Sequence, residues 1–325
     1  MTGPLLEVDG LTKTYGHRRT GKVYALADVS FELDKGETLG VVGESGSGKT
    51  TLGRTLLRLT EPSAGTVRVD GEDIAGLSVR ALKPLRRRLQ IIFQDPFGAL
   101  NPRHTVGKVI GEPLAVHGIG AKADRTARVR DLLEAVGLDQ DAVDRFPHEF
   151  SGGQRQRIAI ARAIALEPDL VVADEPVSAL DVSIQSQILN LIADLRRERG
   201  IAFLFISHDL SVVRHVSDRV AVMYFGRIVE LVETDELFAN PAHPYTVALL
   251  SAVPHVDGDA MPAIDRVAVT GELPDPSDPP PGCPFAARCS KAIEVCRQDR
   301  PQLSKRRLPS GHDRTVACHI FEGIG

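Results

Sequence analysis

The sequence predicts an α/β fold with a largely parallel sheet, followed by a region of a different kind. Up to about residue 238, short runs rich in Val, Ile and Leu alternate with longer helix-like patterns, which is typical of such a sheet. A glycine-rich turn joins one of these runs to a helix-like segment. Beyond residue 240, prolines recur and interrupt both patterns, so the middle of this stretch is expected to be linker-like.

Charge and hydropathy exclude several function classes. The 39 Lys and Arg residues oppose 43 Asp and Glu residues, which leaves a formal charge of −4. No global basic field therefore indicates binding to nucleic acid or anionic lipid. No apolar run approaches the ~18 residues of a membrane-spanning helix, and the first residues lack the pattern of a secretory signal. We expect a chain that does not cross a membrane by itself.

Residues 43–50 (GESGSGKT) fit the phosphate-binding pattern G-x-x-x-x-G-K-[ST]. They follow the apolar run 38–42 and precede the helix-like residues 51–57, which is the strand, loop and helix context that this motif requires. Glycines let backbone N–H groups close around an anion at a helix N-terminus. Lys49 is expected to reach the β- and γ-phosphates of a nucleotide, and the Thr50 hydroxyl to bind Mg²⁺.

Two adjacent carboxylates end a second apolar run, at residues 169–175 (DLVVADE). In open α/β sheets, ligands bind at the carboxyl ends of the strands. Asp174 is expected to orient the hydration shell of Mg²⁺, and Glu175 to polarise the water that attacks the γ-phosphate. Together with the glycine-rich loop, this run indicates a nucleotide hydrolase.

Residues 151–157 (SGGQRQR) stand shortly before that second run, and with them the sequence resembles the ATP-binding cassette (ABC) ATPases. The resemblance implies a P-loop NTPase fold with a mixed-sheet core over residues 1–238 and a helical subdomain at about residues 97–165. It also implies a head-to-tail dimer in which residues 151–154 contact the nucleotide of the opposite subunit. The helix N-terminus expected at Ser151 is physically suited to a phosphate.

Further residues fall in the order of this family. By resemblance, Gln94 senses Mg²⁺ and the attacking water, Asp181 couples the two sites across the dimer, and His208 hydrogen-bonds the γ-phosphate. The family also stacks an aromatic ring on adenine. Tyr15 is preferred for that contact because it ends a predicted strand, and Tyr24 is the alternative.

The expected site thus has three groups of residues. The catalytic residues are Glu175, His208, Gln94 and Lys49. The ATP-binding residues are Tyr15, Gly43, Ser45, Gly46, Ser47, Gly48, Lys49, Thr50, Thr51, Gln94, Ser151, Gly152, Gly153, Gln154, Asp181 and His208. Mg²⁺ is expected to be held through Thr50, Gln94 and Asp174.

Residues 94–103 (QDPFGALNPR) and 240–250 (NPAHPYTVALL) resemble the ATPases of oligopeptide and dipeptide importers, a group that includes nickel and some oligosaccharide importers. The resemblance implies an ATPase that energises uptake of di- or oligopeptides, with nickel or an oligosaccharide as the alternative substrate. A soluble, non-transport cassette ATPase acting on nucleic acid or the ribosome is a second alternative. In this family the segment after Gln94 docks a helix of the membrane subunit, so Phe97 and Leu100 are either docking contacts or packing residues.

The importer resemblance also implies partners. Because the sequence predicts no membrane span, transport requires two separate transmembrane permease subunits. The resemblance adds a second ABC ATPase subunit, either a related chain or a second copy, and an extracytoplasmic substrate-binding protein that acts through the complex. No nucleic-acid partner is expected. The implied location is peripheral, on the cytoplasmic face of the cell (inner) membrane.

The four cysteines gather at Cys283, Cys289, Cys296 and Cys318, within the extension 239–325. Disulfides are rare in cytosolic proteins, and clustered thiolates there more often bind a metal. Four sulfur ligands suit an iron–sulfur cluster or Zn²⁺. The spacers are longer than the short pairs typical of zinc sites, and some relatives carry a 4Fe-4S cluster on a similar tail. A 4Fe-4S cluster is therefore expected, with Zn²⁺ as the alternative.

Overall fold

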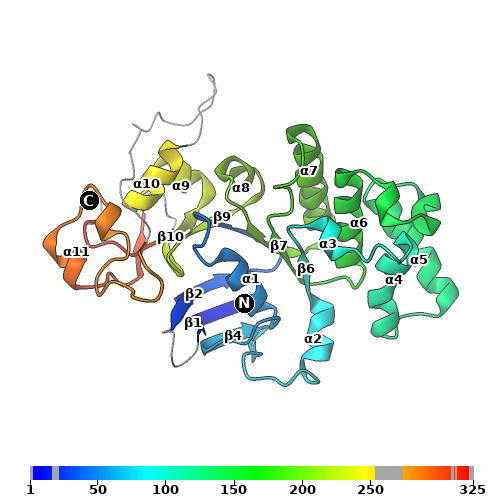
Figure 1. The fold of residues 1–325 in the computed structure, drawn as a ribbon, viewed down its shortest axis with the longest axis horizontal. Helices are drawn as coiled ribbons and strands as arrows, with labels where there is room; N and C mark the ends of the chain where they lie inside the picture. Colours follow the sequence, from blue (N-terminus) through cyan, green and yellow to red (C-terminus); the bar gives the residue numbers. More distant parts are fainter. Residues whose placement is uncertain (1–2, 17–21, 253–273, 309–310, 312, 322–325) are drawn as a thin grey trace. The chain divides into compact units, whose positions relative to one another are not determined.

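The computed structural model describes residues 3–16, 22–252, 274–308, 311 and 313–321 (Figure 1). The chain forms two compact units. The first comprises residues 1–33, 38–75 and 207–325, and the second comprises residues 34–37 and 76–206. Within the described ranges, no helix combines the length and the apolar character needed to cross a membrane.

An antiparallel sheet of four strands forms one part of the first unit. Its order is β2, β1, β4, β5, and the strands are β1 (Leu6–Tyr15), β2 (Val23–Leu33), β4 (Ala64–Val69) and β5 (Glu72–Asp73). β1 is central, because Leu6 pairs with Leu33 of β2 on one side and with Val69 of β4 on the other. The expectation of a largely parallel sheet did not include this antiparallel one.

The second sheet of the first unit is mixed. In the order β11, β12, β10, β9, β3, only β9 and β3 run parallel, and the other pairs are antiparallel. The strands are β3 (Thr38–Val42), β9 (Arg219–Tyr224), β10 (Arg227–Glu233), β11 (Ser304–Arg307) and β12 (Asp313–Val316). All five residues of β3 are buried, which explains its unbroken apolar sequence.

Short helices complete the first unit. They are α1 (Lys49–Leu56), α8 (Leu210–Val216), α9 (Thr234–Ala239), α10 (Pro244–Ser251) and α11 (Glu294–Gln298), with a 3₁₀ turn at Ala286–Arg288. α1 directly follows the glycine-rich loop, and α10 and α11 lie in the C-terminal extension.

Strand β12 joins the extension to the mixed sheet. Its Val316 pairs with Glu230 of β10, and the buried Arg314 guanidinium lies 3.6 Å from the buried Glu230 carboxylate. Burial raises the pKa of Glu230, while backbone N–H donors of Ala242 and His243 at 3.0 and 2.8 Å act in the opposite direction. Strand pairing and a buried ion pair therefore tie the extension to β10.

Three parallel strands form the sheet of the second unit, in the order β6 (Leu89–Ile92), β7 (Leu170–Asp174), β8 (Ala202–Ile206). Every residue of β7 and β8 is buried. The helices are α2 (Leu82–Arg88), α3 (Pro96–Ala99), α4 (Val106–Val116), α5 (Lys122–Ala135), α6 (Gly152–Ile164) and α7 (Val182–Arg199), with 3₁₀ turns at Gln140–Asp144 and Pro147–Glu149. α4, α5 and α6 pack on one another (Figure 1). Parallel and antiparallel strands together with this helical part confirm the predicted α/β fold with a mixed sheet.

Candidate functional site

The glycine-rich pattern forms the predicted loop between β3 and α1. Helix α1 begins at Lys49, and Gly48 occupies its N-cap position. The Ser47 N–H donates to Glu44 O at 3.1 Å, and the Gly226 N–H donates to Ser47 O at 2.9 Å. The loop thus curves in front of a helix N-terminus, where an anion is stabilised by the helix dipole and by exposed N–H groups.

Glycine is required near both ends of this loop. Gly43 and Gly48 have φ values of 154° and 104°. A Cβ on Gly43 would lie 2.2 Å from Met223 O, and one on Gly48 would lie 2.4 Å from Ala25 O. Because both obstacles are backbone atoms, a side chain at either position would displace the loop.

The loop carries the groups that a nucleotide phosphate needs. Lys49 is 6% exposed, and its Nζ donates to Gly43 O at 2.7 Å and to Glu44 O at 3.0 Å. Ser47 Oγ is buried and has no hydrogen-bond partner among the described residues, so a phosphate oxygen would satisfy it. Thr50 follows Lys49 in the first turn of α1, in the position expected for a Mg²⁺ ligand. These residues fit both ATP and Mg²⁺.

His208 belongs to the same unit as this loop. The Ser207 N–H donates to Val41 O at 3.1 Å, so the residue before His208 lies beside the strand that leads into the loop. His208 itself is exposed. Asp209 then caps α8 by accepting from the Ser211 N–H at 2.8 Å, which fixes the backbone on the other side of His208.

Both candidate adenine contacts are accessible aromatic rings on neighbouring strands. Tyr15 ends β1, as predicted, and is 46% exposed. Lys13 Nζ lies 4.9 Å from the centroid of its ring. Tyr24 is 37% exposed on β2. Either ring is available to stack on a base.

The second unit brings two predicted catalytic residues into direct contact. Asp174 is the buried last residue of β7, and Glu175 follows with φ 47°. The Glu175 N–H donates to Ile206 O at 2.9 Å, which sets the direction of the chain at this strand end. Gln94 Nε2 donates to Glu175 Oε2 at 2.8 Å. The sequence predicted that each of these residues follows a strand, but neither the pairing of the two strands nor this hydrogen bond.

Residues 151–157, which carry the resemblance to the ABC ATPases, begin helix α6. Ser151 is its N-cap, with Oγ accepting from the Gln154 N–H at 3.4 Å and the Ser151 N–H donating to Gln154 Oε1 at 3.0 Å. This capping box is a local structural role that the sequence analysis missed. A Cβ on Gly153 would lie 2.5 Å from Ile184 Cγ2, so close packing of α6 on α7 also requires glycine there.

The remaining predicted residues of the second unit have clear positions. Asp181 is the N-cap of α7, and its carbonyl accepts from the Gln185 N–H at 2.8 Å. Phe97 is 60% exposed and lies under the Arg155 guanidinium, 4.1 Å from the ring centroid. Leu100 is 2% exposed, so it packs inside the unit rather than offering a surface.

The predicted residues are divided between the two units. Tyr15, the loop residues 43–51 and His208 belong to the first, whereas Gln94, residues 151–154, Asp174, Glu175 and Asp181 belong to the second. Within the first unit, the sequence analysis missed two neighbours of the loop. Tyr245 and Arg288 of the extension both contact Glu44, and the only sequence signal was that Tyr245 lies in the stretch 240–250.

The prediction of a metal site at the four cysteines is not supported by their arrangement. All four are free thiols, and they line one small cavity, at Cys283, Cys289, Cys296 and Cys318. Yet no group of three or more His, Cys, Asp or Glu side chains in the described part of the chain is arranged to hold a metal ion. Burial raises the pKa of Cys283 to about 11 and also raises that of Cys289. The comparisons reported below lend no support to a 4Fe-4S cluster or Zn²⁺ either.

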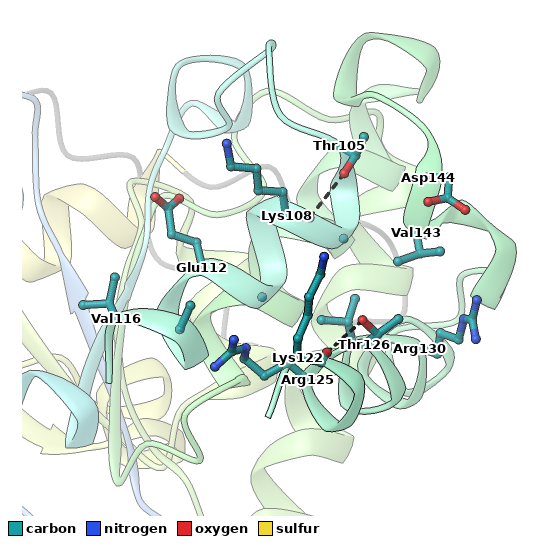
Figure 2. Close-up of a pocket in the computed structure, with 14 residues that line it drawn as sticks. Thr105, Lys108, Glu112, Val116, Lys122, Arg125, Thr126, Arg130, Val143 and Asp144 are labelled. Carbon is teal, nitrogen blue, oxygen red and sulfur yellow. Dashed lines mark hydrogen bonds between the residues drawn. The ribbon is translucent and has the colours of Figure 1, made fainter. Parts of the chain in front are cut away.

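A pocket of about 720 Å³ lies in the helical part of the second unit. Figure 2 shows its lining from α4, α5 and the 3₁₀ turn after them, including Lys108, Lys122, Arg125 and Glu112. None of the predicted ATP-binding or catalytic residues lines it. This pocket is therefore separate from the residues that carry the phosphate chemistry.

Comparison with known families gives two matches. The ABC transporter family model matches residues 26–178. The model of the oligopeptide/dipeptide transporter C-terminal region matches residues 229–296. The first range contains the glycine-rich loop and residues 151–157. The second contains the segment 240–250 and three of the four cysteines.

Similar proteins cover almost the whole chain. A Brucella ovis protein named for peptide import and ATP binding is 54% identical over 309 residues, covering 95% of this chain and 96% of its own. The oligopeptide transport ATP-binding protein AppF of Bacillus subtilis is 51% identical over 305 residues, covering 94% and 92%. Among solved structures, the dimer of the ATP-binding cassette MJ0796 in a post-hydrolysis state with ADP and Pi has a TM-score of 0.65 and 30% identity, covering 70% of this chain and 98% of that one.

Proposed function

Because this chain belongs to the ABC transporter family, among the ATP-hydrolysing subunits of oligopeptide importers, we propose how its residues divide the work of binding and hydrolysing ATP. The glycine-rich loop (residues 43–50) and the N-terminus of α1 bind the β- and γ-phosphates. Lys49 neutralises their charge, and His208 donates to the γ-phosphate. Tyr15 stacks on adenine, with Tyr24 as the alternative. The buried Ser47 Oγ and the glycines of the loop at positive φ support this part of the proposal.

Glu175 is the proposed catalytic carboxylate. It accepts a proton from the attacking water, and Gln94 holds its carboxylate in position through the bond of 2.8 Å from Nε2 to Oε2. That bond is the observation that carries the proposal, because it joins two residues that the family motifs place 81 positions apart. Thr50, Gln94 and Asp174 would hold Mg²⁺, which when bound neutralises charge on the β- and γ-phosphates.

A second copy or a related chain completes each site in this proposal. Ser151, Gly152, Gly153 and Gln154 serve the partner's nucleotide from the start of α6, where Ser151 and Gln154 are exposed. Asp181 at the start of α7 links the two sites. The dimeric structure of the similar cassette MJ0796 with ADP and Pi supports the pairing of two cassettes. ATP binding would then favour the closed dimer, and hydrolysis would release it.

We assign transport to a larger complex at the membrane. Two transmembrane permease subunits carry the substrate, and this chain binds them from the cytoplasmic face of the inner membrane as a peripheral subunit. An extracytoplasmic binding protein delivers the substrate to the complex. The exposed Phe97 ring beside Arg155 is the proposed contact for a permease helix, whereas Leu100 is buried and is assigned a packing role. We retain residues 1–238 as the cassette and residues 239–325 as its extension.

The proposed cargo is a di- or oligopeptide. The names of the Brucella and Bacillus relatives support peptide over nickel or oligosaccharide, and they do not favour a soluble ATPase acting on nucleic acid or the ribosome. The test is uptake by proteoliposomes that hold the purified complex and its binding protein. ATP-dependent accumulation of labelled oligopeptides, but not of ⁶³Ni²⁺ or a labelled oligosaccharide, is the expected result. ATP-dependent uptake of either alternative without peptide uptake would contradict the assignment.

A further inference from the structure

Glu44, the residue after Gly43 in the glycine-rich loop, forms hydrogen bonds through its N–H, its carbonyl and its carboxylate. The Glu44 N–H donates to the Tyr245 hydroxyl at 2.8 Å. The Glu44 carbonyl accepts from Lys49 Nζ at 3.0 Å. The Glu44 carboxylate accepts hydrogen bonds from both terminal nitrogens of Arg288, at 2.9 and 3.2 Å. Two of these three partners belong to the C-terminal extension, 201 and 244 residues away in the sequence.

The partner residues are themselves fixed by packing. Tyr224, Tyr245 and Phe285 are each at most 2% exposed, and their ring centroids lie 4.6 to 5.4 Å apart. Arg288 is the last residue of the 3₁₀ turn that follows Phe285. Its side chain is 10% exposed, and it also donates to the Tyr224 hydroxyl at 3.3 Å. A bidentate Arg–carboxylate pair that packs on these buried aromatic rings has a defined geometry, which a single surface ion pair lacks.

The charge of Glu44 makes this arrangement matter for ATP. Glu44 shares its carbonyl with Lys49, so its carboxylate belongs to the same short loop that must receive a polyanion. A partly buried carboxylate without compensation would repel the phosphates, since the effective dielectric constant there is well below that of water. Arg288 removes that repulsion and at the same time fixes the loop backbone next to Gly43.

We propose that Arg288 and Tyr245 are positioning residues of the ATP site: the C-terminal extension holds the glycine-rich loop through Glu44 and neutralises its charge, so that ATP affinity depends on the extension. The inference rests on the proposed role of the loop. It assigns the extension a function that is carried by its aromatic residues and the Arg288–Glu44 pair.

The test measures binding of a fluorescent ATP analogue to the full chain with Mg²⁺, at low and high salt. Arg288→Ala is expected to raise Kd about tenfold, the size of effect of one charge-assisted pair, and to raise it less at high salt. Arg288→Lys keeps the charge but not the fork, so an intermediate Kd is expected. In the complex, KM for ATP should rise more than kcat falls. Arg297→Ala, an exposed arginine of the same extension, is the matched control and should bind as the unaltered chain does.

Glu44→Gln separates electrostatics from simple loss of structure. Once the carboxylate is gone, adding Arg288→Ala should change Kd by much less than it does in the unaltered chain. Thermal unfolding of every variant checks folding, and Arg288→Lys serves if Arg288→Ala does not fold. Unchanged Kd in Arg288→Ala, or an equal loss with and without Glu44, would overturn the inference. Lys49→Ala tests the loop itself, because undiminished binding in that variant would instead overturn the proposed function.

Discussion

Gln94 Nε2 donates to Glu175 Oε2 over 2.8 Å, and this bond connects the ends of two adjacent parallel strands. Gln94 is two residues beyond β6, and Glu175 directly follows β7. The backbone of Glu175, with a φ of 47°, fixes the position of its Cα but leaves several rotamers open to the carboxylate. The amide of Gln94 selects among these rotamers, so the pair acts as a unit in which one side chain orients the other.

Removal of the orienting amide should reduce the rate of hydrolysis more than the binding of ATP. We expect Gln94→Ala to lower kcat about 10- to 100-fold, because a carboxylate misplaced by about 1 Å loses catalytic effect on that scale. Steady-state hydrolysis by the complex measures kcat, and analogue binding measures Kd. Gln298→Ala, at an exposed position of α11, is the control. A normal kcat in Gln94→Ala would show that Glu175 does not need this bond.

Ser151 has two roles that one substitution separates. Asp is as good an N-cap as Ser, so Ser151→Asp should keep α6 and change the unfolding free energy by well under about 1 kcal/mol. Its negative charge would nevertheless face the partner's nucleotide, and hydrolysis should be lost. Ser151→Ala should cost about 1 kcal/mol of stability by comparison. Chemical denaturation and ATPase assays decide, and an active Ser151→Asp complex would leave Ser151 with the capping role alone.

Gly48 should not tolerate a methyl group. At φ 104°, with Ala25 O 2.4 Å from the new Cβ, Gly48→Ala combines backbone strain of about 1–3 kcal/mol with displacement of the loop. We expect lower thermal stability and strongly reduced ATP binding. Gly76→Ala is the matched control, since no atom lies within 4 Å of its Cβ and its φ is ordinary. Equal behaviour of the two variants would contradict the loop geometry.

His243 should make the protein less stable in mild acid. Burial lowers its pKa from 6.5 to about 3, so the folded state holds the neutral ring while the unfolded state gains a proton below pH 6.5. Stability is therefore full above that pH and falls as the pH decreases toward 3, by about 2 kcal/mol between pH 7 and pH 5.

Asn at position 243 keeps an acceptor for the Tyr245 N–H, which His243 Nδ1 now accepts at 3.0 Å, but it does not titrate. His243→Asn should lower stability at pH 7 and yet show a smaller loss between pH 7 and pH 5. Urea unfolding at the two pH values measures this difference. An unchanged pH dependence in the variant would show that another group causes the acid sensitivity.

Much of the site could be predicted because its chemistry is local in sequence. The loop 43–50 lies between one strand and one helix, and Asp174 and Glu175 end a fully buried strand. The antiparallel sheet of β1, β2 and β4 was missed because its register shifts, for example between Val8 and Leu11, break the simple alternation that marks a half-buried strand.

Long-range contacts of the extension could not be predicted from the sequence. β12 pairs with β10 over a sequence separation of more than 80 residues, and Arg288 bonds to Glu44 over a separation of 244 residues. No motif in the neighbouring sequence of either partner indicates these contacts. The cysteines show the opposite failure. Their spacing indicated a shared site, and they do line one cavity. A metal also requires a ligand arrangement, and no group of three or more His, Cys, Asp or Glu side chains among the described residues has one.

The most direct test of the central claim is ATP turnover by the complex assembled with Glu175→Gln. The amide is nearly isosteric with the carboxylate but cannot accept the proton of the attacking water. We predict that ATP binding is retained while turnover falls about 10²- to 10⁴-fold, the usual contribution of a general base. Hydrolysis at the rate of the unaltered complex would contradict the account, because Glu175 would then not be the catalytic carboxylate.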